Sequence, residues 1–204
     1  MYAPKTMKLY DFPLSGNCHK VRLMLSLLQL DYDLVFVNLK EGEQKTAAFL
    51  QLNPLGQVPV LIDEEVVICD SQAILVYLAR RYGGEQWLPT DAKSMSQVMK
   101  WLSITANNIQ NSIAAARLHF LFNIQLDLDL AQQKAYQILQ IFNEHLSRRE
   151  WLECSRPTIA DIACFPYIAL APQGKISLDA YPHVTAWINR IKDLPGYISM
   201  PGIG

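Results

Sequence analysis

The sequence predicts an α/β domain at residues 7–82 and an all-helical domain at residues 90–204. Short runs rich in β-branched and apolar residues alternate with helical patterns in the first of these segments, and none occurs in the second. The pair Gly83-Gly84, with Pro89 a few residues later, is typical of a helix end and a linker. We therefore expect the order βαβ, then ββα, then helices only.

The first half of the α/β domain is built from three runs of residues. Lys8–Phe12 and Tyr32–Leu39 predict strands, and between them apolar side chains at residues 21–28 recur with helical spacing. Because the connection between two such strands is a right-handed crossover, we expect the strands to be parallel. A short helix at Ala47–Leu52 follows, and residues 1–6 are expected to be an appended or frayed leader.

The second half predicts a β-hairpin followed by a helix. Two apolar runs, Val58–Ile62 and Val66–Ile68, flank a charged turn, and the helix begins at Asp70-Ser71. If the peptide bond before Pro59 is cis, the N–H and C=O groups of Val58 can pair with an extended ligand. The N–H groups at the start of the helix can bind a carboxylate. Taken singly, each feature favours a tight turn or an ordinary cap; together, they suit a small peptide ligand.

Helical patterns account for the chain after the linker. Apolar side chains recur with helical spacing from Val98 to Phe120, from Ala131 to Leu146 and from Val184 to Ile191. Thr158 and Asp161 have the spacing of a capping box, which predicts the start of a further helix. No strand and no internal repeat are expected in this domain.

Composition and charge argue against several classes of protein. Hydrophobic residues make up 50% of the chain and charged residues 18%, which is typical of a folded protein. A net charge of −1 argues against nucleic acid as a partner. The longest apolar stretch, Ala163–Ala171, is too short to span a bilayer, and the N-terminus lacks the apolar run of a signal peptide. We therefore expect no membrane association and a cytoplasmic location.

Metal binding and disulfide formation are not expected. The cysteines show neither CxxC nor zinc-site spacing, and we predict reduced thiols, as in cytosolic proteins. No two histidines have the spacing of metal ligands. The cysteines are Cys18, Cys69, Cys154 and Cys164, and the histidines are His19, His119, His145 and His183.

The run NPLGQVPVL at residues 53–61, with DSQAI at residues 70–74, resembles the glutathione site of the glutathione S-transferase superfamily. A TIADIA-type cap, recurrent in the second domain of that family, occurs at residues 158–163, so the resemblance covers residues 7–198. It implies a thioredoxin-like first domain, an all-helical bundle as the second, and glutathione as a co-substrate. Asp70 stands where the family motif usually has Glu.

The loop after the first strand, Ser15-Gly16-Asn17-Cys18, is where a thioredoxin-like fold carries out its chemistry. Redox members of the fold have a nucleophilic cysteine where Ser15 stands, so intramolecular dithiol chemistry is not expected. Resemblance to the serine-type transferases makes Ser15 a hydrogen-bond donor to the glutathione thiolate; otherwise it is only the N-cap of the helix. Resemblance to the bacterial nu-like group gives the donor role to Asn17, and both alternatives stay open.

The same resemblance assigns the other contacts to glutathione. Asp70 is expected to pair with the γ-glutamyl ammonium, Ser71 with the adjacent carboxylate, and Val58 with the cysteinyl backbone. The glycine carboxylate falls on Gln44 or Lys45, of which Lys45 is preferred because it is a cation. The expected glutathione contacts are Ser15, Gln44, Lys45, Gln57, Val58, Asp70 and Ser71.

A pocket for the second substrate is expected between the loop that starts at Phe12 and the long helix that begins near Asp91. Asn107 and Asn111 are four residues apart, so both can face this pocket from one side of that helix. A subunit interface or solvent is the alternative environment for these two amides, and is slightly favoured.

We therefore predict an enzyme, a glutathione transferase that activates the glutathione thiol for conjugation to a small electrophile, as in detoxification. A glutathione-dependent reductase of disulfides or peroxides, of the nu-like type, is the first alternative. A non-catalytic glutathione-binding or docking module is the second. The resemblance also implies a homodimer.

Overall fold

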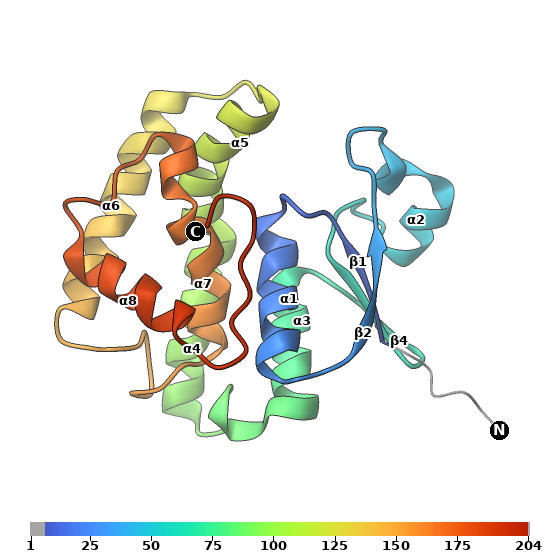
Figure 1. Cartoon of the computed structure of the whole chain (residues 1–204), viewed down its shortest axis with the longest axis horizontal. Coiled ribbons are helices and arrows are strands. Elements are labelled where there is room, and N and C mark those ends of the chain that lie inside the picture. Colours follow the sequence, from blue (N-terminus) through green and yellow to red (C-terminus); the bar gives the residue numbers. More distant parts are fainter. Residues whose placement is uncertain (1–6, 204) are drawn as a thin grey trace.

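A computed structural model shows the predicted α/β domain beside the all-helical domain (Figure 1). The structure describes residues 7–203, so the expected leader at residues 1–6 lies outside the described residues. No helix within the described range is long and apolar enough to cross a membrane. The two domains meet where α1 (Gly16–Leu27) packs against α7 (Ile159–Ala169).

The sheet of the first domain is mixed, with strand order β2-β1-β3-β4. β1 (Met7–Asp11) and β2 (Tyr32–Phe36) are parallel, which confirms the crossover. β3 (Val60–Asp63) is antiparallel to β1 and forms a hairpin with β4 (Val66–Cys69). β2 ends before the predicted Leu39 because its last residue already lies opposite the last residue of β1.

Helices cover both faces of this sheet. α1 and α3 (Ser71–Leu78) lie between the sheet and the helical domain, and α2 (Ala47–Leu52) lies on the opposite side (Figure 1). The bounds of α2 are those that the sequence predicts. The remaining helical segments of this domain are η1 (Glu43–Lys45), the π-helical η2 (Ala79–Gly83) and η3 (Gly84–Gln86).

The second domain is helical, and its described residues add only an isolated β-bridge between Met200 and Ile203. Its long first helix, predicted as one segment, changes to a π-helix in its middle. Hydroxyls of Thr105 and Ser112 donate there to carbonyls one turn earlier, a contact that disturbs helical geometry. The helices are α4 (Ala92–Ile104), the π-helical η4 (Thr105–Ala114), α5 (Ala115–Phe122), α6 (Leu128–Leu146), α7, η5 (Ala171–Gly174) and α8 (Pro182–Lys192).

The predicted capping box starts α7. The hydroxyl oxygen of Thr158 accepts from the N–H of Ala160 at 3.2 Å, and Asp161 Oδ2 accepts from the N–H of Thr158 at 2.9 Å. Both reciprocal bonds of the motif are therefore present, which confirms the spacing argument.

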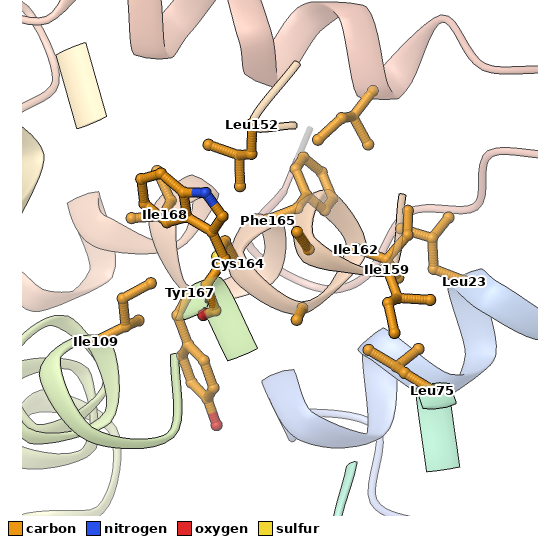
Figure 2. Close-up of a cluster of buried hydrophobic side chains, with 14 of the residues drawn as sticks. Leu23, Leu75, Ile109, Leu152, Ile159, Ile162, Cys164, Phe165, Tyr167 and Ile168 are labelled. Atoms are coloured by element: carbon orange, nitrogen blue, oxygen red, sulfur yellow. Dashed lines mark hydrogen bonds between the residues drawn. The ribbon is translucent and has the colours of Figure 1, made fainter. Parts of the chain in front are cut away.

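α7 lies at the centre of a core that both domains share. Figure 2 shows Leu23 of α1 and Leu75 of α3 beside Ile159 and Ile162 of α7. All four side chains are fully buried. Because the core is continuous across the domains, α7 supports α1 and the loop that precedes it.

A buried ion pair holds the loop between β1 and α1 in place. Arg22 of α1 donates to Asp11 at the end of β1, and its second nitrogen donates to the carbonyl oxygen of Pro13 at 3.2 Å. Burial raises the pKa of Asp11, and Arg22 opposes this shift. The strand end, the helix and the intervening loop are thereby held together.

His19 of α1 is fully buried against Phe165 of α7, with 6.4 Å between the ring centroids. Neither ring nitrogen has a hydrogen-bond partner among the described residues. Burial, with a smaller contribution from the charge of Arg22, lowers the pKa of His19 from 6.5 to about 3. The imidazole is therefore neutral in the folded protein at neutral pH.

His19 is expected to make the protein less stable in mild acid. The unfolded state takes up a proton near pH 6.5 and the folded state only near pH 3, so this contribution is complete above pH 6.5 and is lost as the pH falls. Between pH 7.5 and 5 the loss amounts to about 2 kcal/mol of unfolding free energy. When urea unfolding is measured at both pH values, the free energy of unfolding of His19→Phe should fall by about 2 kcal/mol less than that of the native protein. Equal losses in the two proteins would contradict the assignment.

Candidate active site

A cavity of about 430 Å³ opens beside the N-terminal end of α1, between the two domains. This volume is typical of sites that bind small molecules. Its walls come from the loop after β1, from the segments before β3 and α3, and from η4, α5 and α7. The lining residues are Ser15, Asn17, Leu39, Gln44, Gly56, Gln57, Val58, Asp70, Ser71, Gln72, Ala106, Gln110, Leu118 and Tyr167.

Ser15 is the N-cap of α1, and it also faces the cavity. Its Oγ accepts a hydrogen bond from the N–H of Cys18 at 3.2 Å. Its backbone N–H donates to the carbonyl of Phe12 at 2.9 Å and closes the turn after β1. A capping hydroxyl accepts through a lone pair, so its hydrogen is still available to a ligand. The capping role and a donor role are therefore compatible.

The side-chain oxygen of Asn17 is engaged by donors from the protein. This oxygen accepts from Lys20 Nζ at 2.7 Å and from Ser71 Oγ at 3.4 Å. An ammonium group can only donate, so the atom it meets is the oxygen, and the Asn17 amino group is left for a ligand. The sequence shows His19-Lys20 as part of the resemblance to the nu-like group, but it predicts no role for Lys20, because helical spacing does not distinguish it from a solvated lysine.

Val58 presents free main-chain groups at the edge of the first domain. The Val58–Pro59 peptide bond is cis. Among the described residues, neither the N–H nor the C=O of Val58 has a hydrogen-bond partner. The adjacent Gln57 is exposed, and Asn53 Nδ2 donates to its carbonyl oxygen at 2.8 Å. An extended peptide can therefore pair with the main chain of Val58.

Asp70 and Ser71 form the polar end of the cavity. Asp70 has a positive φ of 73°, which is uncommon outside glycine and frequent at ligand sites. Its Oδ1 caps α3 by accepting from the N–H groups of Gln72 and Ala73 at 2.9 and 3.0 Å. Within the described chain, no hydrogen bond reaches its Oδ2. Ser71 is buried, and its hydroxyl contacts the side chains of Gln72 and Asn17.

Gln44 and Lys45 of η1 are placed differently with respect to the cavity. Gln44 lines it, with Nε2 donating to the carbonyl of Leu39 at 3.5 Å and a buried Oε1 that lacks a described partner. Lys45 is outside the lining, because its ammonium donates to the carbonyl of Leu55 at 3.2 Å. Of the two residues, the structure places Gln44 at the cavity, although the sequence favoured Lys45.

The three residues expected at a second-substrate pocket lie elsewhere. Phe12 is buried and packs against Phe36 and Phe122, with ring centroids 6.3 and 6.4 Å away. Asn107 and Asn111 are exposed, bond to each other at 2.9 Å and line a separate hollow against α6. A different face of η4 reaches the main cavity.

Comparison with known proteins agrees with this geometry. Residues 5–80 match the glutathione S-transferase N-terminal domain, and residues 95–195 match the glutathione S-transferase C-terminal domain. Glutathione S-transferase 3 of Zea mays is 32% identical, over 94% of this chain and 91% of its own. The chain belongs to the glutathione S-transferase family.

Two solved structures and a bacterial relative broaden the comparison. A glutathione S-transferase from Pseudomonas fluorescens has a TM-score of 0.91 at 33% identity, covering 97% of this chain and 100% of its own. A glutathione transferase homolog from Drosophila mojavensis with bound glutathione has a TM-score of 0.85 at 27% identity, covering 93% and 89%. The disulfide-bond oxidoreductase YfcG of Escherichia coli is 29% identical, over 92% of this chain and 90% of its own.

In this glutathione S-transferase the helical domain supplies one wall of the site. Tyr167 of α7 is 5% exposed and lines the cavity. Its ring lies so close to Gly16 that a Cβ there would be 2.8 Å away, which explains the glycine. Gly16 was the single sequence signal of this contact. The sequence analysis also did not predict the lining residues Leu39, Gly56, Gln72, Ala106, Gln110 and Leu118.

The cavity of the transferase is suited to hydrogen bonding. Its polar groups are hydroxyls, carboxamides, main-chain groups and the carboxylate of Asp70. Among residues 7–203 no group of three or more His, Cys, Asp or Glu side chains is placed to hold a metal ion. A peptide that carries both charges matches such a set of donors and acceptors.

Proposed function

We propose that this glutathione S-transferase ionises the thiol of bound glutathione with Ser15 and Asn17 and directs the thiolate to a small electrophile. The observation that carries this proposal is their common position. Both side chains line one cavity at the start of α1, with a hydroxyl hydrogen and an amino group available to a ligand. The positive end of the helix dipole adds to their effect.

The tripeptide is proposed to lie along the first domain. Asp70 Oδ2 takes the γ-glutamyl ammonium, and Ser71 with the N-terminus of α3 takes the neighbouring carboxylate. The free N–H and C=O of Val58 pair with the cysteinyl residue, which places its sulfur near Ser15. Gln57 and Gln44 contact the glycine end, and Lys45 joins them if its ammonium leaves Leu55.

The required energy is modest. A free thiol has a pKa of about 8.5, and lowering it by two units takes about 2.7 kcal/mol. Hydrogen bonds to charged groups contribute about 1.5–3 kcal/mol each. A hydroxyl donor and a carboxamide donor in one half-buried site are therefore sufficient.

Reduction of disulfides is the second candidate activity, favoured by the similarity to YfcG and by the nu-like segment Asn17-Cys18-His19-Lys20 at the start of α1. The same thiolate would attack the glutathionyl sulfur of a mixed disulfide. One S–S bond breaks and another forms, which gives glutathione disulfide and a free thiolate of the second compound. No protein thiol takes part in this exchange.

We also propose a homodimer that acts in the cytoplasm to detoxify electrophiles. Between α3 and α4 an exposed, mainly apolar hollow is lined by Val76, Met99 and Leu102, which supports a subunit contact there. Cys18, Cys69, Cys154 and Cys164 are free thiols, which fits a reducing compartment.

Parallel assays with an activated aryl halide and with a glutathionyl mixed disulfide test the proposal. Conjugate formation is expected, and Ser71→Ala should raise the KM for glutathione about tenfold through loss of a charged hydrogen bond. Ser96→Ala, on the exposed side of α4, is the matched control and should behave as the native protein. Turnover of the disulfide alone would favour the reductase, and absence of glutathione binding would leave only a docking module.

A further inference from the structure

Lys20 is a buried lysine without a carboxylate partner. It lies on α1 with an exposed fraction of 1%. Its Nζ donates to Asn17 Oδ1 at 2.7 Å and lies 5.3 Å from the centre of the Tyr167 ring. No ion pair to Lys20 exists among residues 7–203. A buried ammonium is costly unless an anion or acceptors surround it, so its position requires an explanation.

The groups around Lys20 come from three helices. Cys18 is on the same helix, Asp70 caps α3, and Cys164 and Tyr167 are on α7. Burial raises the pKa of both cysteines and of Tyr167 to about 12, so these groups are neutral at pH 7. Asp70 is exposed and already caps its helix. The negative charge of Asp70 raises the pKa of Lys20 and partly opposes the effect of burial, although the two groups form no ion pair.

Burial lowers the pKa of Lys20 to about 8. The group is still protonated at neutral pH, and an anion bound nearby would hold its proton more firmly. A thiolate held by the Asn17 amino group would be such an anion, separated from the ammonium by a single carboxamide. The charge of Lys20 and that of the thiolate would then stabilise each other in a site of low dielectric.

The contact also determines how Asn17 is oriented. The carboxamide oxygen accepts from the Lys20 ammonium at 2.7 Å, which orients the amide with its amino group on the other side. An ammonium on the oxygen draws electron density from the amide and strengthens its N–H donors. Without Lys20, the side chain could turn its oxygen to the ligand and repel a thiolate.

We propose that Lys20 is a positioning residue for thiol ionisation, which presents the amino group of Asn17 to the sulfur of glutathione and compensates the thiolate charge. This inference rests on the proposed function. It gives a functional reason for the burial of the Lys20 ammonium, which would be unfavourable if the side chain served packing alone.

The test is an ultraviolet titration of the thiolate of glutathione bound to the full chain. Lys20→Met is expected to raise the pKa of the bound thiol by about one unit, with about a tenfold loss of kcat/KM at pH 6.5. In an Asn17→Ala background the same substitution should raise the pKa by only about half a unit, which is the contribution of the charge, because the share that acts through the Asn17 amide is already lost. Lys93→Met, at an exposed position of α4, is the matched control and should leave the titration unchanged.

Thermal unfolding distinguishes this role from a structural one. Methionine removes an unpaired buried charge, so the melting temperature of Lys20→Met should stay equal or rise while the thiol pKa becomes less favourable. If Lys20→Met does not fold, Lys20→Gln keeps a donor without the charge and should raise the thiol pKa by about half a unit.

Three results would overturn the proposal. The first is a thiol pKa that is unchanged in the lysine variants while the native protein still ionises glutathione. The role of Lys20 would then be wrong, and the proposed function would be unaffected. The second is an equal shift with and without Asn17. The third is failure of the native protein to bind glutathione, which removes the proposed function as well.

Discussion

Asp161→Ala is expected to lower the free energy of unfolding by about 3–5 kcal/mol, because each buried donor left without its acceptor costs about 1–3 kcal/mol. Asp161 is fully buried at the start of α7. Its Oδ1 accepts from the N–H of Leu152 and from Trp187 Nε1, both at 3.0 Å, and its Oδ2 accepts from the N–H of Thr158 at 2.9 Å. The Thr158 hydroxyl also donates to Oδ2, at 3.2 Å, so alanine would leave four buried donors without this acceptor.

An exposed helix cap of the same residue type provides the control. Asp91 caps α4 by accepting from the N–H of Ser94 at 2.8 Å, and water can replace it there. Asp91→Ala should therefore cost much less than Asp161→Ala. Urea unfolding at pH 7.5 measures both variants. Equal losses would show that burial of Asp161 and its contact with Trp187 add nothing to ordinary capping.

Asn17→Ala and Ser15→Ala are each expected to lower kcat/KM for conjugation about ten- to a hundredfold at pH 6.5, because each removes one donor to the thiolate. Above the pKa of the free thiol the two variants should recover, since glutathione then arrives ionised. Ser15→Ala should also destabilise the protein by about 1 kcal/mol, because Ser15 caps α1. Asn17→Ala should also destabilise the protein, because it removes the acceptor of the buried Lys20 ammonium.

The pH profile of kcat/KM, measured from pH 5.5 to 9, checks this account of the site. Asn189→Ala, on the exposed side of α8, is the control for loss of an amide and should follow the native profile. A loss of activity that is the same at every pH would point to misplacement of the loop rather than to loss of thiol ionisation.

Local signals in the sequence were sufficient for most of the fold. The helix at Ala47–Leu52 and the capping box at Thr158 and Asp161 depend on residues that are close in the chain, and the structure confirms both. The parallel pairing of β1 and β2 follows from the handedness of crossovers rather than from any single residue.

The remaining features of the site depend on packing between segments that are far apart in the chain. Local sequence patterns contain no information about this packing. The spacing of Asn107 and Asn111 shows that they share a face, but only the packing of η4 on α6 decides where that face points. The position of Tyr167 in the cavity depends on the fit of α7 to Gly16 of the other domain. Likewise, the acceptor for Lys45 is a loop carbonyl ten residues away in the chain.

The most direct measurement is the number of protons released when glutathione binds, obtained by calorimetry at pH 7 in two buffers of different ionisation enthalpy. The native protein is expected to release about 0.7 proton per bound glutathione, because a thiol whose pKa falls from about 8.5 to about 6.5 becomes mostly ionised at pH 7. Ser15→Ala and Asn17→Ala should bind glutathione and release clearly less. Binding by the native protein without proton release would contradict the claim that this cavity activates the thiol.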